Sequence, residues 1–407
     1  MSFQQGLSGL NAAARNLDVI GNNVANANTI GFKQARAEFA DLYANTLASA
    51  GRATVGLGVT TTNVAQQFSQ GNISTTNSPL DMAINGGGMF RVSNNGSIAY
   101  TRNGQFQIDK SGYVVTGNGG RLSGFPVDAT GKLTTGAPAD LRISASDIAP
   151  KTTSEISLVM NLDSRKTVPT GTFSPTDAAT YTSATSLNVY DSQGNAHAMS
   201  TYLVKSATAN TWDVYATLDG TQIGAGTVGT LVFNPDGSLD ATASAVPFNV
   251  ALTTTNGATF PAGMPIDFTG TTQFGSAFGV NAANQDGYAA GKLTGLAVDE
   301  SGVITGRYSN GQSQVQGQIA LVSFANLQGL SPMGGNQWVE SSASGTPLIG
   351  TPGSTNLGML QSGAVEESNV DLTAELVNMI TAQRNYQANA QTIKTQDQVL
   401  QTLVNLR

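Results

Sequence analysis

The chain has 407 residues, which allows two or three domains of ~150 residues and exceeds the size of a peptide or miniprotein. Charged residues make up 11% of the chain, the formal net charge is −7 and cysteine is absent. The few Lys and Arg residues argue against a nucleic-acid-binding face, and the lack of thiols excludes disulfides, thiolate metal sites and cysteine nucleophiles.

The first residues, from Met1 to Leu7, carry neither a basic segment nor an apolar core of the kind found in secretory signal peptides. We therefore expect no cleavable signal, so that any export uses another route. No apolar run approaches the roughly 18 residues of a membrane-spanning helix, and we expect no membrane insertion.

The N-terminal segment carries a helical pattern. Its apolar and small side chains alternate at spacings of three and four, as in the seam of a heptad repeat, at Phe3, Leu7, Leu10, Ala14, Leu17, Gly21 and Val24. Ser2 and Gln5 fit a capping box at the start of this helix. Gly6 and Gly9 each cost up to about 1 kcal/mol in a helix interior, so we expect the segment to be disordered until something packs on it.

Residues from about 51 to 77 are rich in Gly, Thr and Gln without a clear period, and we interpret them as an extended connector. The long middle of the chain alternates polar and apolar residues between turn signals, which predicts many short antiparallel strands. Type I turns and two-residue hairpins are predicted at Asp109/Gly112, Asp128/Gly131, Asp191/Gly194, Asp299/Gly302, Asn95/Gly96 and Asn103/Gly104.

Three features of the middle suggest a catalytic, nucleotide or metal site, and we interpret each of them as structural. His197 is the single histidine and follows a turn, so we interpret it as a solvated or structurally bonded residue, not a catalytic one. Residues 224–229 match the glycine pattern of a dinucleotide loop, but a strand and a turn follow where a helix is needed. The turn carboxylates are too few for a calcium loop. We expect no enzyme activity, no metal and no cofactor.

A second helical pattern ends the chain, with seam positions at Leu372, Leu376, Met379, Gln383, Tyr386, Ala390, Ile393, Asp397, Leu400 and Val404. Asn369 or Asp371 is the predicted cap, and the helix would be roughly 50 Å long. We expect Glu366 and Glu367 to favour the helix dipole, with a catalytic carboxylate pair as the weaker interpretation. The two terminal helices either pair within one subunit or, through contacts that do not close, build an open helical polymer.

Three sequence stretches carry a family resemblance. They are residues 16–33 (NLDVIGNNVANANTIGFK), residues 78–90 with 100–106 (SPLDMAINGGGMF and YTRNGQF), and residues 367–372 with 375–380 and 383–387 (ESNVDL, ELVNMI and QRNYQ). The chain resembles the bacterial flagellar rod and hook proteins. Its length favours the hook members, because the rod members are shorter and lack a large inserted domain.

The resemblance implies a mainly β fold with terminal α-helices, in which antiparallel β-sandwich or barrel domains are nested and both chain ends form a coiled-coil domain. The implied domains are a terminal helical domain (1–30 and 365–407), a connector (31–77 and 357–364), an inner β domain (78–145 and 286–356) and an outer inserted β domain (146–285). The implied family motif residues are Asn22, Asn23, Asn26, Gly31, Phe32, Asn369 and Asp371.

The implied function is that of a structural subunit of the flagellar hook, which polymerises into a curved tubular universal joint and transmits torque from rod to filament. The alternative is another axial component such as the distal rod protein; an unrelated β-rich adhesin and a nucleotide enzyme are further hypotheses. The positions expected to pack between helices of one or neighbouring subunits are Leu7, Leu10, Leu17, Val24, Leu376, Met379, Tyr386, Ile393 and Leu400.

The implied partners are other copies of the chain, the rod, hook cap and hook–filament junction proteins, and the type III export apparatus, with no nucleic acid and no membrane insertion. The implied location is the hook, outside the cell.

Overall fold

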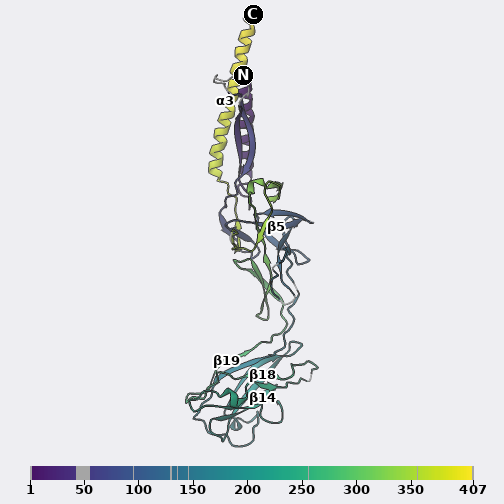
Figure 1. Ribbon diagram of the computed structural model, residues 1–407, viewed down its shortest axis with the longest axis vertical. Coiled ribbons are helices and arrows are strands. Elements are labelled where there is room, and N and C mark those ends of the chain that lie inside the picture. Colours follow the sequence, from purple (N-terminus) through teal and green to yellow (C-terminus); the bar gives the residue numbers. More distant parts are fainter. Residues whose placement is uncertain are drawn as a thin grey trace. The chain divides into compact units, whose positions relative to one another are not determined.

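The computed structural model describes residues 2–42, 56–94, 96–128, 131–134, 136–144, 146–254, 256–354 and 356–405. The chain forms two compact units. Unit 1 comprises Met1–Ala145, Gly295–Arg307 and Ser313–Arg407, and unit 2 comprises Ser146–Thr294 and Tyr308–Gln312. The fold is mainly β with a long helix near each end of the chain, as the sequence predicts (Figure 1).

The elements of unit 1 come from both ends of the chain. Before the insertion of unit 2 they are α1 (Ser2–Ala25), β1 (Ala35–Leu42), β2 (Gly58–Gln66), β3 (Ile73–Thr75), β4 (Met82–Asn85), β5 (Met89–Asn94), β6 (Ser97–Thr101), β7 (Phe106–Ile108), β8 (Val114–Thr116), β9 (Arg121–Pro126) and β10 (Ala139–Asp140). After it come β22 (Ser313–Ile319), β23 (Leu321–Ser323), β24 (Ser331–Gly334), β25 (Gln337–Val339), β26 (Leu348–Gly350), β27 (Met359–Ser362), β28 (Ala364–Glu366) and α3 (Leu372–Asn405).

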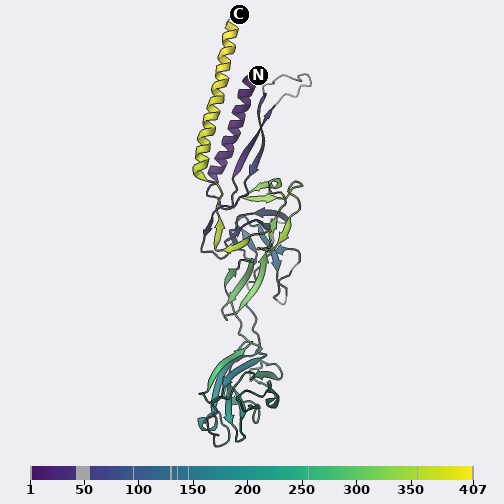
Figure 2. The same cartoon turned by 60° about the vertical axis from the view of Figure 1, so that its left-hand side comes forward.

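The helical part of unit 1 consists of α1, α3 and a long hairpin. Figure 2 shows α1 and α3 side by side and antiparallel, with the β1–β2 hairpin next to α1. The end of α3 extends past the start of α1 (Figure 2). The hairpin pairs from Ala35 and Gln66 to Leu42 and Gly58.

The segment interpreted as an extended connector, residues 51–77, contains one strand of that hairpin. Val59, Thr61 and Val64 lie in regular strand β2, because a Thr- and Val-rich stretch suits a pleated surface even without strict polar and apolar alternation. Residues 51–55 lie outside the described residues.

The β part of unit 1 has a small core of its own. Strands β22, β9, β5, β6, β25 and β24 are neighbours in one sheet. One cluster of its buried core consists of Met89, Tyr100, Val322, Phe324, Leu330 and Trp338. Two short pairs, β27 with β4 and β28 with β3, bring the end of the chain back to the N-terminal segments. Both α-helices therefore leave the same part of unit 1.

Unit 2 is a sandwich of two sheets. One contains β11 (Ile156–Asn161), β17 (Phe248–Val250), β18 (Met264–Asp267) and β19 (Gly279–Gln285); the other contains β12 (Ser183–Tyr190), β13 (Ala196–Lys205), β14 (Thr211–Leu218), β15 (Thr221–Gln222) and β16 (Gly229–Val232). A one-turn helix, α2 (Ala241–Ser244), follows β16. The strands β20 (Leu293–Val298) and β21 (Val303–Tyr308) lie mostly in unit 1, where they extend its sheet next to β22.

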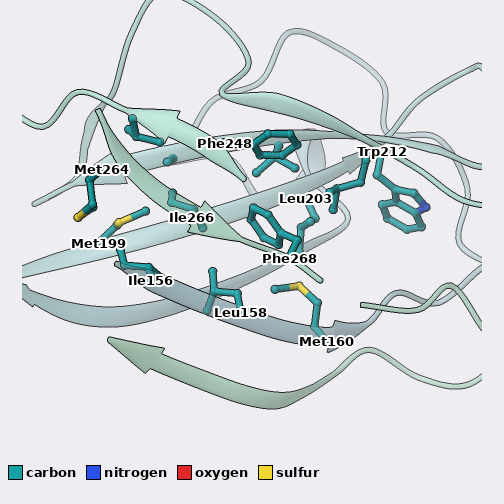
Figure 3. Packing of buried hydrophobic residues seen from close by; sticks show 14 of the residues in the cluster. Ile156, Leu158, Met160, Met199, Leu203, Trp212, Phe248, Met264, Ile266 and Phe268 are labelled. Carbon is teal, nitrogen blue, oxygen red and sulfur yellow. The ribbon is translucent and has the colours of Figure 1, made fainter. Parts of the chain in front are cut away.

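Large apolar side chains fill the space between the two sheets. Figure 3 shows Trp212, Leu203, Phe268 and Met160 within this cluster, and each is fully buried. Most of the pairing is antiparallel, as predicted, but β11 pairs in parallel with β18, and Asn161 forms a parallel bridge with Thr272. Alternation along β11 places every second residue in the core, which is the expected result of the two-residue period of a strand.

The turn predictions are confirmed at the four Asp-x-x-Gly sites. In the first, Asp109 Oδ1 accepts from Ser111 N at 2.8 Å, and Gly112 has a φ of 86° that a Cβ would strain. The hairpin predicted at residues 95–96 joins β5 and β6, which pair at Asn94 and Ser97. Asn95 itself lies outside the described residues.

The hairpin predicted at Asn103 and Gly104 is wrong. β6 pairs with β5 and β25, while β7 pairs with β8. Gly104 instead passes so close to Met82 that a Cβ would lie 1.6 Å from the Met82 carbonyl oxygen. A close backbone approach, not a two-residue turn, requires this glycine.

Candidate assembly interface

The start of α3 is fixed by two side chains with different tasks. Asp371 caps the helix, because its Oδ1 accepts from Thr373 N at 2.9 Å and Ala374 N at 3.1 Å. Asn369 joins the two chain ends, since its Oδ1 accepts from Gln34 N at 2.7 Å and its amide donates to Gln67 O at 2.8 Å. Of the two predicted caps, Asp371 is the correct one.

The end of α1 is held by asparagines of the predicted motif. Asn23 is 1% exposed, and its amide pairs with both the N–H and the C=O of Ala35, as a neighbouring strand would. Asn26 donates to Asn22 O at 2.9 Å and accepts from Thr29 Oγ1 at 3.2 Å. These side-chain bonds hold the last turn of α1 and the residues that follow it in place.

Gly31, a residue of the predicted motif beyond the end of α1, allows a close approach of the backbone. Its φ is 71°, and its N–H donates to Glu366 O at 2.8 Å. A Cβ at this position would lie 2.6 Å from Asn103 N. Only glycine permits this approach of the two chain ends. The next residue, Phe32, is half-buried.

A buried charge cluster lies where the chain ends meet, and the sequence analysis missed it. Glu366 is fully buried; its Oε1 accepts from Lys33 Nζ at 2.5 Å and from Gly71 N at 2.9 Å, and its Oε2 accepts from Arg102 Nη1 at 3.0 Å. Burial lowers the pKa of Lys33, and the neighbouring Glu366 opposes this effect. Lys33 Nζ also donates to Ser69 O at 2.7 Å.

This cluster corrects the interpretation of Glu366 as a residue that favours the dipole of α3. The carboxylate lies in β28 and bridges cations from two distant segments. Removing one partner of such a buried pair leaves an uncompensated charge, which typically costs about 3–5 kcal/mol. Lys33, Arg102 and Glu366 all lie in or beside the stretches that resemble the family, which marks them as candidates. Their spacing in the sequence does not show that they meet.

The predicted seam of α1 is rotated from the face that the subunit buries. Gly6, Ala13 and Ile20, at intervals of seven, are buried on α1. Leu7 is exposed, and Leu10, Leu17 and Val24 are half-buried. One residue corresponds to about 100° of helix rotation, so the predicted seam lies beside the face that contacts α3.

Gly6 and Gly9 of α1 have a packing role. A Cβ on Gly6 would lie 3.0 Å from Ile393 Cγ1, and one on Gly9 would lie 2.7 Å from Asn389 Oδ1. α1 therefore approaches α3 closely through these glycines. A Cβ on Gly21 would meet no described atom within 4 Å outside the neighbouring backbone of α1, so this glycine is not needed for a close contact.

Most of α3 is exposed. Ala382 and Glu375 are its buried residues among those described, and Met379 and Ile393 are half-buried. The large apolar residues exposed on the helix are Leu372, Leu376, Val377, Ile380, Tyr386, Val399, Leu400 and Val404. The two helices do pair within one subunit, and this pairing leaves an apolar surface that a neighbouring protein surface can cover.

The residues set aside as non-catalytic are held in structural contacts. His197 Nδ1 lies 2.6 Å from Asp219 Oδ2, and its Nε2 lies 3.2 Å from Asp191 Oδ2. Partial burial alone would lower the pKa of His197, but these two carboxylates outweigh it and raise the pKa. The glycine-rich loop at 224–229 leads into strand β16, as expected.

Within the described ranges, no group of three or more His, Asp or Glu side chains is arranged to hold a metal ion. A search of the same residues finds no helix both long and apolar enough to cross a membrane.

Comparisons with known families match most of the chain in four blocks. Residues 3–33 match the flagella basal body rod protein family, and residues 83–159 match the flagellar hook protein FlgE/F/G D1 domain. Residues 161–288 match the flagellar basal body protein FlaE D2 domain, and residues 361–406 match the flagellar basal body rod FlgEFG protein C-terminal family.

Among curated proteins, the chain is similar to the flagellar hook protein FlgE of Salmonella typhimurium (47% identity) and of Escherichia coli K12 (46%), each over 100% of both chains. The FlgE of Borreliella burgdorferi is 33% identical over 100% of this chain and 99% of its own. Among solved structures, the Helicobacter pylori flagellar hook protein FlgE2 matches with a TM-score of 0.53 and 15% identity, covering 71% of this chain and 99% of that one. This last match shows the fold alone.

Proposed function

The chain belongs to the flagellar hook protein family, and from this relationship we propose that it is a structural subunit of the bacterial flagellar hook. Such a subunit polymerises into a curved tube that acts as a universal joint and transmits torque from rod to filament. The relatives named hook protein match over the full length of both chains, which favours a hook subunit over the distal rod alternative.

The observation that carries the proposal is the exposed apolar surface of α3. In an isolated chain this surface contacts water, and covering it with other copies stabilises a polymer through the hydrophobic effect. The predicted packing positions Leu376, Tyr386 and Leu400 are exposed here, so we propose that they are buried between subunits. Leu7 is proposed to join them from α1.

We extend the proposal to location and partners. Membership of the family supports a place in the hook, outside the cell, between rod proteins on one side and hook–filament junction proteins on the other. A cap protein and the type III export apparatus are the further proposed partners. The role is mechanical, and no catalytic step is assigned to any residue.

We also propose the finer division of the chain that the family suggests. In it, 1–30 and 365–407 form the helical layer, 31–77 and 357–364 the connector, 78–145 and 286–356 the inner β domain, and 146–285 the outer domain. Limited proteolysis of assembled and unassembled protein would test these boundaries.

Electron microscopy of the full-length protein at high concentration in a kosmotropic salt tests the function, because such salts strengthen apolar burial. We expect tubes from the full-length chain and none from a variant lacking residues 1–27. Compact particles from both proteins, even with preformed hook fragments added as templates, would contradict the proposal.

A further inference from the structure

A buried carboxyl group in the first turn of α3 has an oxygen without a hydrogen-bond partner. Glu375 is 3% exposed, and its Oε1 accepts from Gln34 Nε2 at 2.6 Å. Its Oε2 has no donor among the described residues. A buried carboxylate oxygen without a protein donor is unfavourable, so an arrangement that brings a donor to it is favoured.

Glu375 also lines a cavity of about 280 Å³ formed by α1, α3 and the start of β1. The other lining residues include the amide side chains of Asn16, Asn23, Asn378 and Asn385. A cavity with one carboxyl group and several amide oxygens suits a cation with several N–H donors, such as a guanidinium.

One cation of the same chain, Arg36, also lines the cavity. Arg36 lies 3.4 Å from Glu38 Oε1, and its side chain is 68% exposed. Arg384, by contrast, is exposed and forms no ion pair within the described part of the chain. It follows Glu375 by nine residues, which is about 13.5 Å and two and a half turns. Arg384 therefore lies on the opposite face of α3 and cannot reach its own Glu375.

We propose that Arg384 of one copy donates to Glu375 of a neighbouring copy when the subunits assemble. The inference rests on the proposed polymer and names one contact that orders it. The donor and the acceptor lie on different faces of α3, so each bound copy still offers an unused donor and an unused acceptor. A contact of this kind repeats without closing, as a helical polymer requires.

A double-mutant cycle on the critical concentration for assembly tests the pair. We expect Glu375→Gln and Arg384→Gln each to raise the critical concentration about tenfold, and the double variant to raise it no further than either alone. Lys394→Gln is the matched control, because it removes one positive charge from an exposed position of the same helix. Its effect should add to that of Glu375→Gln.

Additive effects of Glu375→Gln and Arg384→Gln, with tubes still formed by the unaltered protein, would overturn the pair and leave the polymer standing. Failure of the unaltered protein to assemble on templates would overturn both proposals. Coupling of Glu375→Gln with Arg36→Gln in the unfolding of the unassembled chain would show that the donor is Arg36 and would also overturn the pair.

Crosslinking gives a second readout that does not depend on the folding of Glu375→Gln. The chain has no cysteine, so Glu375→Cys and Arg384→Cys each introduce a single thiol. Copolymers of the two variants, treated with a short bismaleimide, should give crosslinked dimers, while Glu375→Cys with Lys394→Cys should give none. Equal yields from both mixtures would contradict the proposal.

Discussion

Unit 2 and the helix α3 use apolar residues in opposite ways. In unit 2, side chains such as Trp212, Phe268 and Met160 lie between two sheets and are inaccessible to water. In α3, comparable side chains such as Leu376, Ile380 and Val404 are largely exposed. The sandwich thus carries its own stabilising core, whereas the helix depends on surfaces that other copies supply. The difference separates the part of the subunit that folds alone from the part that assembles.

The largest expected effect comes from a charge in the exposed surface of α3. Leu376→Asp should abolish assembly, because a carboxylate would be buried between subunits without a partner. The β-sheet circular dichroism of the unassembled chain should be unchanged, since Leu376 contacts no sheet core. Sedimentation after salt addition measures the polymer. Tubes formed by Leu376→Asp would contradict burial of this residue between subunits. So would a failure of the volume-conserving control Leu376→Met to assemble.

A substitution that creates a cavity in unit 2 should lower the stability of that unit, whereas Leu376→Asp should leave the β-sheets unchanged. Trp212→Ala removes a fully buried side chain whose Nε1 donates to Gln273 Oε1 at 2.7 Å. We expect a loss of about 3–5 kcal/mol, or a decrease in the Tm of unit 2 of roughly 10 °C by calorimetry. The remaining tryptophan, Trp338, reports on unit 1 by fluorescence and should be unaffected. A shared decrease in both units would show that they do not fold independently.

A smaller effect concerns pH and unit 2 alone. The pKa of His197 is raised in the folded state, so its stabilisation is complete below about pH 6.5 and is lost as the pH rises through the raised pKa. His197→Gln should therefore lower the Tm of unit 2 by about 2–4 °C at pH 6, and by less at pH 9. A difference in Tm that does not change over this range would exclude the ion pairs with Asp191 and Asp219.

The smallest effect distinguishes the two faces of α1. Gly21→Ala meets open space and should stabilise the helix by about 0.5–1 kcal/mol, which helical circular dichroism of the unassembled chain can measure. Gly6→Ala gains the same helix propensity, but its Cβ must displace Ile393. We expect less gain there. Equal gains at both positions would show that α1 does not pack on α3 before assembly.

The sequence predicts the local features of this fold well. Asp191 with Gly194 forms the predicted turn, because Asp bonds its own backbone and Gly adopts positive φ without any distant partner. The heptad spacing likewise predicts both helices. It does not show which stripe each subunit buries, since the close contact of α1 with α3 uses Gly6 and Gly9, which carry no apolar side chain.

Contacts between the chain ends could not be predicted in the same way. Lys33 and Glu366 are 333 positions apart, and no periodic pattern relates them. Their pairing depends on the way β28 returns to β3, which is a property of the whole unit. The cap at Asp371, by comparison, depends on two adjacent N–H groups and is visible in a short stretch of sequence.

The extension of α3 past α1 gives the subunit a direction. Gly6 lies against Ile393, so the last turns of α3, with Val399 and Val404, continue beyond the first residues of α1. Another copy can cover these turns only by approaching from that side. If the subunits assemble head to tail, as proposed above, we expect the two tips to differ, because the exposed end of α3 points toward one of them. A monomer arriving in solution would meet a different surface at each tip, so we expect the two tips to grow at different rates.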